Sequence, residues 1–241
     1  MAVATGKTPG CGRGSRNRPI KSWAKSDGMT FSIGDATDQA LVASIAHEMS
    51  MCRISFMEFI HLARISEANP VIQIHAVKAN SMYCRFLCHL YEFYIGCISR
   101  DRKSTSQFSS EIADEVITLE AKKQIVQIRF MIREGLVPKM SHVDIKTIQS
   151  LSVPPAFGKH FRLLRNRMSH VLAERSMPSK APDLRYMYDN YHAIFMILFN
   201  TAQFSWSSEH DSNRRWGDIG EYICFHFMPN TSVPQKRHGG D

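Results

Sequence analysis

The residues best suited to chemistry in this chain stand together in the segment 165–170, which reads RNRMSH. Arginine presents a planar, permanently charged fork that matches the oxygens of a phosphate. Histidine titrates near neutral pH, so it can take a proton from a ribose 2′-hydroxyl or give one to a leaving oxygen. Arg165, Asn166 and His170 together therefore predict cleavage of RNA with the 2′-hydroxyl as the nucleophile. This chemistry needs no metal and no other cofactor.

The segment lies in a longer stretch, FGKHFRLLRNRMSHVLAERS, with the apolar spacing of an amphipathic helix. With Phe161 facing the core, about 100° per residue places Arg165 at the buried edge of a polar face and Asn166 beside His170. Arg165 is expected to stabilise the charge of a phosphorane-like transition state. The weaker candidates for substrate binding on and beside this face are Arg162, Arg167 and Ser169.

The spacing alone is loose, because composition predicts about two cases of an arginine followed by a histidine after four to six residues. Two occur, and the second runs from Arg185 to His192. The alternative interpretation of RNRMSH is a solvated helix face with a surface histidine. A single His170 cannot easily act as both base and acid, so a two-fold homodimer is expected to supply a second Arg/His pair.

The rest of the chain predicts an all-α protein, an up-and-down bundle of about five long helices in one domain spanning residues 31–228. Apolar residues recurring three and four positions apart are expected to face the core, among them Ile74, Val77 and Leu119. An alternating pattern at 223–227 permits a short strand. The expected helices are 35–67, 70–100, 110–134, 157–175 and 183–204, with a short helix at 142–150.

Charge is concentrated at the start of the chain. Residues 1–30 hold six Lys or Arg and one Asp, which gives +5 of the total +8. This segment is predicted to be a disordered basic arm, either a solvated tail, an extension upstream of a start at Met29, or an arm that adds sequence-independent affinity for nucleic acid. Residues 229–241 are predicted to be a disordered tail.

Composition excludes several classes. The longest apolar run, 193–199, is far shorter than the roughly 20 residues of a membrane span, so no membrane association is expected. No secretory signal pattern is present. The six cysteines form no CxxC pair and show no zinc-ligand spacing, so they predict small buried side chains in a cytoplasmic protein.

Two further groups of residues are candidates for binding. The aromatic stripe at 187–199 is expected to be core or a dimer interface rather than a platform for stacked bases. His160 is expected to be a surface or satisfied core group, with a role in binding RNA as the alternative.

The stretch LRNRMSH resembles the signature of HEPN domains, a helical family in which an arginine and a polar residue precede a histidine on a late helix of the bundle. Arg165, Asn166 and His170 match this signature. The resemblance implies a metal-independent endoribonuclease that acts as a dimer, in the class of toxins and antiviral or abortive-infection effectors. It also implies RNA as the substrate and an antitoxin or regulatory partner.

The resemblance leaves some features open. Members often carry a further polar or acidic residue on an earlier helix, and Glu92 or Arg85 are candidates, with a solvent-facing or satisfied residue as the alternative. One toxin subgroup has a tyrosine two residues after the histidine as the target of a modifying antitoxin, and this chain has Leu172 there. The alternative function is a catalytically inactive helical module for binding or dimerisation.

Overall fold

The computed structural model describes residues 29–68, 73–136, 142–169 and 183–210. This part of the chain is all-α, as the sequence predicts, and contains no strand beyond an isolated bridge between Thr30 and Ser104. The helices are α1 (Ala36–Ala68), α2 (Gln73–Asp101), α3 (Ser110–Arg133), α4 (His142–Ser150), α5 (Phe157–Ser169) and α6 (Leu184–His210).

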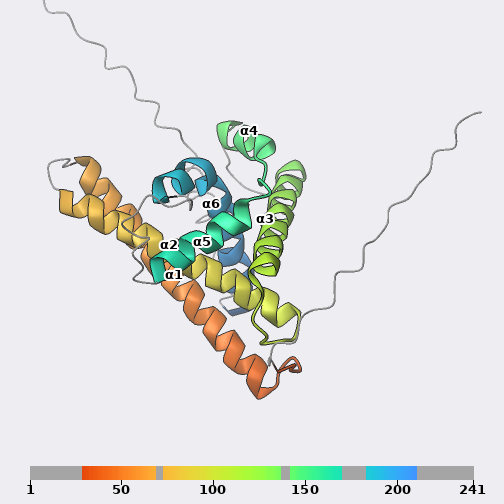
Figure 1. Cartoon of the computed structure of the whole chain (residues 1–241). Helices are drawn as coiled ribbons and strands as arrows, with labels where there is room; N and C mark the ends of the chain where they lie inside the picture. Colours follow the sequence, from red (N-terminus) through yellow and green to blue (C-terminus); the bar gives the residue numbers. More distant parts are fainter. Residues whose placement is uncertain (1–28, 69–72, 137–141, 170–182, 211–241) are drawn as a thin grey trace, which may run out of the picture.

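The longest helices, α1 and α2, form an antiparallel hairpin that runs the length of the molecule (Figure 1). Asp35 caps α1, because its carboxylate accepts hydrogen bonds from the backbone N–H groups of Thr37 and Asp38. At the open end of the hairpin, Arg100 of α2 donates two hydrogen bonds to the Asp38 carboxylate. The cap at Asp35 thus defines the start of α1, and the Asp38–Arg100 ion pair holds this end of α1 against the end of α2.

Gly96 shows why a weak helix former stands inside α2. A Cβ at this position would come within 2.7 Å of the Ile45 side chain of α1. The glycine therefore permits a close approach of the two helices, and its local cost in helix propensity is offset by packing.

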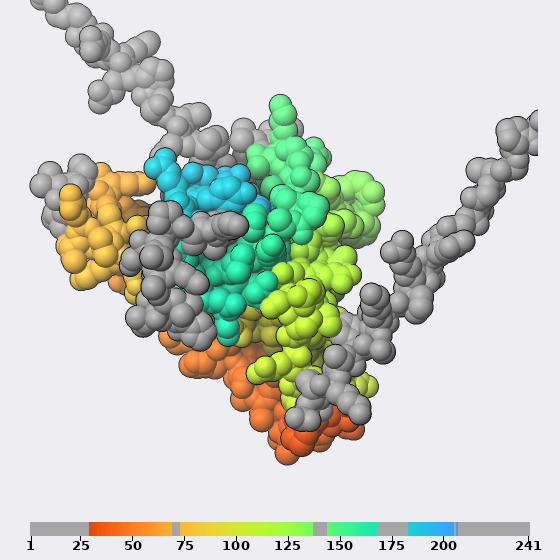
Figure 2. Space-filling model, viewed as in Figure 1, coloured from red at the N-terminus to blue at the C-terminus, as the bar shows by residue number. Residues whose placement is uncertain are grey.

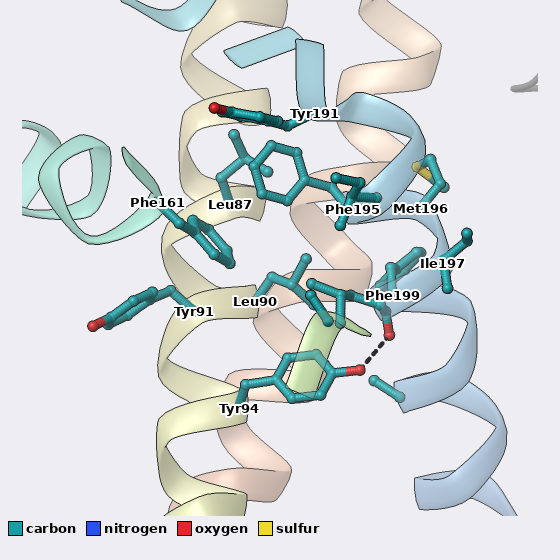
Figure 3. Packing of buried hydrophobic residues seen from close by; sticks show 14 of the residues in the cluster. Leu87, Leu90, Tyr91, Tyr94, Phe161, Tyr191, Phe195, Met196, Ile197 and Phe199 are labelled. Atoms are coloured by element: carbon teal, nitrogen blue, oxygen red, sulfur yellow. Dashed lines mark hydrogen bonds between the residues drawn. The ribbon is translucent and has the colours of Figure 1, made fainter. Parts of the chain in front are cut away.

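The core is rich in aromatic residues and is shared by α1, α2, α3, α5 and α6; Figure 3 shows the part between α2, α5 and α6. Phe161 of α5 lies 5.2 Å from the Tyr91 ring and 4.8 Å from the Phe195 ring, measured between ring centroids. The Tyr94 hydroxyl donates to the backbone carbonyl of Leu198, 2.7 Å away, which satisfies a fully buried phenol. Most of the predicted stripe on α6 is core, since Met187, Tyr191, Phe195 and Phe199 are buried, whereas Tyr188 is 43% exposed.

The succession of helices departs from simple up-and-down neighbours after the first pair. α3 packs mainly against α5 and α6 rather than against the preceding α2. α5 lies across α2, α3 and α6, so its side chains reach three different helices (Figure 1). The helix that carries the RNRMSH segment is thus held from several sides.

Three predicted core positions are wrong. Ile74 and Val77 at the start of α2 and Leu119 on α3 are all more than half exposed. Helical spacing shows that a helix has apolar faces, but when there are two such faces it does not show which one packs against another helix. On α3 the buried face is built instead on Ile117, Ala121 and Ile125.

Some predictions lie outside the described residues: the basic arm except for its last two residues, the strand at 223–227, the tail, and the motif helix beyond residue 169. None of the described helices is long and apolar enough to span a membrane. Of the four cysteines in the described ranges, Cys52 and Cys84 are buried, as predicted, and Cys88 and Cys97 are partly buried.

Candidate functional site

The start of α5 is fixed tightly on α3. The backbone N–H of Gly158 donates to Thr118 Oγ1 at 3.0 Å, and the Thr118 hydroxyl donates in turn to the carbonyl oxygen of Asp114 at 2.7 Å. A Cβ on Gly158 would lie 2.0 Å from that same carbonyl oxygen. Only glycine lets the two backbones approach so closely, so this contact sets the position of α5.

The rotation of α5 follows from its buried residues. Phe161 and Leu164 are buried, as the sequence predicts. With these two side chains in the core, Arg162, Arg165 and Asn166 emerge on the partly exposed sides of the helix. The polar face predicted from spacing is therefore present in the described part of α5.

Arg162 binds Asp114 of α3. Its Nε and Nη2 donate to the two carboxylate oxygens at 2.7 and 3.0 Å, the bidentate geometry of a strong charge-assisted pair. The hydrogen bond to Asp114 raises the pKa of the Arg162 guanidinium above its usual range. Both side chains are mostly buried, at 17% and 20% exposed. The pair ties α5 to α3 immediately beside the contact at Gly158.

Arg165 sits one turn further along α5 and meets a different helix. Its Nε donates to Glu92 Oε1 of α2, and its Nη1 donates to Asn166 Oδ1 at 3.1 Å. The Arg165 and Glu92 side chains are each one-third exposed. The structure thus brings together three residues identified from the sequence, and it places them where solvent reaches the guanidinium.

Tyr91 interacts electrostatically with the charged residues of both ion pairs. Its ring packs on Phe161, and its hydroxyl points away from the apolar cluster (Figure 3). Burial raises the pKa of Tyr91 to about 12, with a further contribution from the charge of Glu92. The phenol therefore stays neutral over the physiological pH range, next to Arg162 and Arg165, and is an O–H group rather than an additional charge.

The remaining candidates are less completely described. His170 lies outside the described residues, as does the side chain of Ser169. Arg167 lies on α5 and is half-buried. Arg85 lies on α2 and is exposed.

The second Arg/His spacing has a different environment. Arg185 is 91% exposed and lies 3.6 Å from Asp189 on the same helix, whereas His192 is buried. His192 Nδ1 lies 2.8 Å from the Tyr83 hydroxyl, and its ring stacks on Tyr188 at 4.4 Å between centroids. His192 is therefore enclosed by aromatic residues. The Arg185/His192 pair resembles the Arg165/His170 pair in sequence spacing, but its histidine is closed to solvent.

His160 forms a third contact of α5, with α6. Its Nδ1 lies 2.8 Å from the Tyr191 hydroxyl, and its ring meets the edge of Tyr186. Partial burial lowers the pKa of His160, and the nearby charge of Lys159 lowers it further. His160 is thus a partner of tyrosines at the α5–α6 contact.

Sequence reasoning missed Asp114 and Thr118, the residues of α3 that hold α5. They lie four positions apart on one side of the helix, which is a common polar spacing with nothing to mark its partner. Within the described ranges, no three His, Cys, Asp or Glu side chains come together as ligands for a metal ion.

Comparison with known proteins adds no further assignment. No protein-family model matches the chain, and neither a curated protein nor a solved structure matches it.

Proposed function

We propose that this protein is a metal-independent endoribonuclease in which Arg165, Asn166 and His170 act on a phosphodiester of RNA. One observation carries the proposal: Arg165 is held between Glu92 and Asn166 at the α2–α5 contact with a third of its side chain open to solvent. A guanidinium fixed in this way loses little conformational freedom when it binds phosphate oxygens. The similarity of LRNRMSH to the HEPN signature supports the same assignment.

The reaction follows from the residue types. His170 takes the proton of the 2′-hydroxyl, and the resulting oxygen attacks the adjacent phosphorus. The bond from phosphorus to the 5′-oxygen of the next nucleotide breaks, and that oxygen takes a proton as it leaves. The products are a 2′,3′-cyclic phosphate and a 5′-hydroxyl. Arg165 stabilises the extra negative charge on the phosphorus oxygens during the attack.

Glu92 acts through Arg165 in this scheme. Its carboxylate lies on α2, whose buried residues are part of the core, so it orients the guanidinium from a rigid element. Asn166 holds the Nη1 side of the same group. A second copy related by a two-fold axis would provide the second histidine as the acid, as the sequence suggests. RNA and a second copy are the proposed partners, and a toxin or antiviral-defence role with an antitoxin or other regulator is the proposed setting.

The test is cleavage of defined RNA by pure protein in the presence of EDTA. We expect Arg165→Ala and His170→Ala each to abolish cleavage, with products of the wild type ending in cyclic phosphate. Arg185→Ala is the matched control, because Arg185 is an exposed arginine of the other Arg/His spacing. Full cleavage by the His170→Ala protein would rule out the proposal.

An inactive binding or dimerisation module is the second candidate function. The observation in its favour is that the Arg165 guanidinium already has a carboxylate partner, as a purely structural arginine would. Wild-type protein that binds RNA or dimerises but produces no cyclic-phosphate ends would favour this candidate.

A further inference from the structure

An exposed apolar stripe runs along α3. Leu119, Val126 and Phe130 are 53%, 64% and 50% exposed. They are spaced by seven and four residues, so at about 100° per residue their side chains fall within about 40° of one another. Three large apolar side chains aligned on one helix face favour an interface rather than scattered surface residues.

The stripe is separate from the face of α3 that packs in the core. Ile117, Ala121 and Ile125 are buried and point about 120–160° away from Leu119 around the helix. α3 therefore has apolar side chains on two opposite sides. Within the described residues it lies along one edge of the molecule, where Figure 2 shows it in yellow-green. The inner side is covered by α5 and α6.

The charges at the two ends of the stripe show which partner fits it. Glu115 and Arg133 are both exposed and both lie about 40° to the same side of Leu119. Glu115 is nine residues before Gln124, and Arg133 is nine residues after it. A two-fold axis at the level of Gln124 would thus bring Glu115 of one copy level with Arg133 of the other, on the same side of the helix pair.

The apolar residues fit the same arrangement. When two copies of α3 run antiparallel about Gln124, Leu119 of one copy lies within one residue of the level of Phe130 of the other. Val126 of one copy lies level with Lys122 of the other copy, and the alkyl part of that lysine side chain can cover it. Arg133 at present pairs with Glu134, at 3.0 Å with side chains 73% and 45% exposed, and its guanidinium lies 5.3 Å from the centroid of the Phe130 ring, on the stripe itself. An ion pair so exposed contributes little, so Arg133 can exchange partners at small cost.

We propose that the exposed stripe of α3 pairs two copies of this chain as antiparallel helices, with Glu115 and Arg133 forming two symmetric ion pairs. This interface differs from one that would join two Arg165 sites. Asp114, which binds Arg162, lies about 140° around α3 from Leu119, so pairing through the stripe leaves the Arg165 side uncovered. The inference therefore does not depend on the proposed ribonuclease activity.

The first test is the mass of the full chain in solution by sedimentation equilibrium, over about 1 to 200 µM, since interfaces below about 1,200 Å² are typical of transient complexes. We expect Val126→Glu to halve the mass of the wild-type assembly and to raise the dissociation constant by more than about tenfold. Val77→Glu is the matched control, because Val77 is 63% exposed on another helix and should leave the mass unchanged. Circular dichroism verifies that both variants keep the wild-type helix content.

The second test uses charge. Glu115→Arg and Arg133→Glu should each weaken the assembly several-fold, because each places like charges opposite each other, and the double variant should restore it. Arg185→Glu, at an exposed ion pair on α6, should have no effect. The measured quantity is mass, so protein that fails to cleave RNA tests this proposal equally well. A wild-type chain that stays monomeric at the highest concentration would overturn the proposal. So would a wild-type assembly mass that Val126→Glu leaves unchanged, or a double charge variant that assembles no better than the single variants.

Discussion

Arg162 and Arg165 stand one turn apart on the same helix, and each binds a carboxylate, yet their surroundings differ. Arg162 donates twice to Asp114 of α3, and the two side chains are 17% and 20% exposed. Arg165 donates once to Glu92 of α2 and once to its neighbour Asn166, and its ion pair is one-third exposed on both sides. The first pair fastens α5 to α3, and the second presents a guanidinium at the surface.

The difference shows how one helix can combine a mostly buried anchor with an arginine that solvent reaches. A bidentate, mostly buried pair gains strength from its low-dielectric setting and is difficult to exchange. A pair at the surface is weaker, because solvent screens its charges. Because Gly158, Thr118 and Asp114 already fix the start of α5, Arg165 does not have to serve as an anchor.

The largest expected effect is a difference in the rate of RNA cleavage between variants of Arg165 and variants of Arg162. Lysine keeps the charge but loses the planar fork, so Arg165→Lys should lower the rate of RNA cleavage about hundredfold. Arg162→Lys should change that rate far less. Single-turnover cleavage at equal protein concentration measures both. Equal losses from the two variants would mean that the division between anchoring and reactive arginine is wrong.

The next effect concerns the close contact at Gly158. Gly158→Ala places a methyl group against the carbonyl oxygen of Asp114 and should lower the free energy of unfolding by about 2–3 kcal/mol. Gly135→Ala would be a poor comparison because of its positive φ, so the control is Ser44→Ala on the exposed side of α1. Urea unfolding followed by circular dichroism gives both values. If Gly158→Ala unfolds at the same urea concentration as the wild type, α5 can shift away from α3 without loss of stability.

A smaller effect compares the two carboxylates. Asp114→Asn removes the charge from a mostly buried pair and should cost about 1–2 kcal/mol of stability. Glu92→Gln should cost less than about 1 kcal/mol, because solvent screens the more exposed pair. The same urea experiment ranks them. The reverse order would place the stronger anchor at α2 instead of α3.

The smallest effect is a pH dependence at the third contact of α5, with α6. Burial lowers the pKa of His160 below its ordinary value near 6.5, so the folded state favours the neutral ring. Its contribution to stability is complete above about pH 6.5 and is lost as the pH falls through the folded-state pKa. Wild-type protein should therefore lose more thermal stability between about pH 7.5 and pH 5.5 than His160→Gln. Identical pH profiles would show that His160 does not contribute to acid sensitivity.

The helices themselves could be predicted closely. The spacing of apolar residues placed the described helices within three residues of their observed starts, but α6 ends at His210, six residues beyond the predicted end at 204. The polar face of α5 also followed from its spacing, because a helix turns by a fixed angle per residue. The positions of the helices and the polar face of α5 both depend on local geometry, and a short stretch of sequence is enough to predict it.

The partners across the bundle could not be predicted in the same way. Glu92 was a candidate only through a family resemblance, and Asp114 was not recognised at all. Leu119 was expected in the core but is exposed, since α3 carries apolar residues on two faces and periodicity does not say which face another helix covers. The pairing of each arginine depends on which helix lies opposite, and that is decided by the packing of all of them together.

By itself, the sequence determined that the described part of this chain forms helices, approximately where they begin, and that α5 has a basic face beside an apolar one. Only the tertiary structure decided that Arg162 meets α3, that Arg165 meets α2, and that one side of α3 stays exposed. The physical reason is that helix periodicity arises from hydrogen bonds four residues apart, whereas ion pairs and buried faces join residues that are 48 and 73 positions apart in the chain.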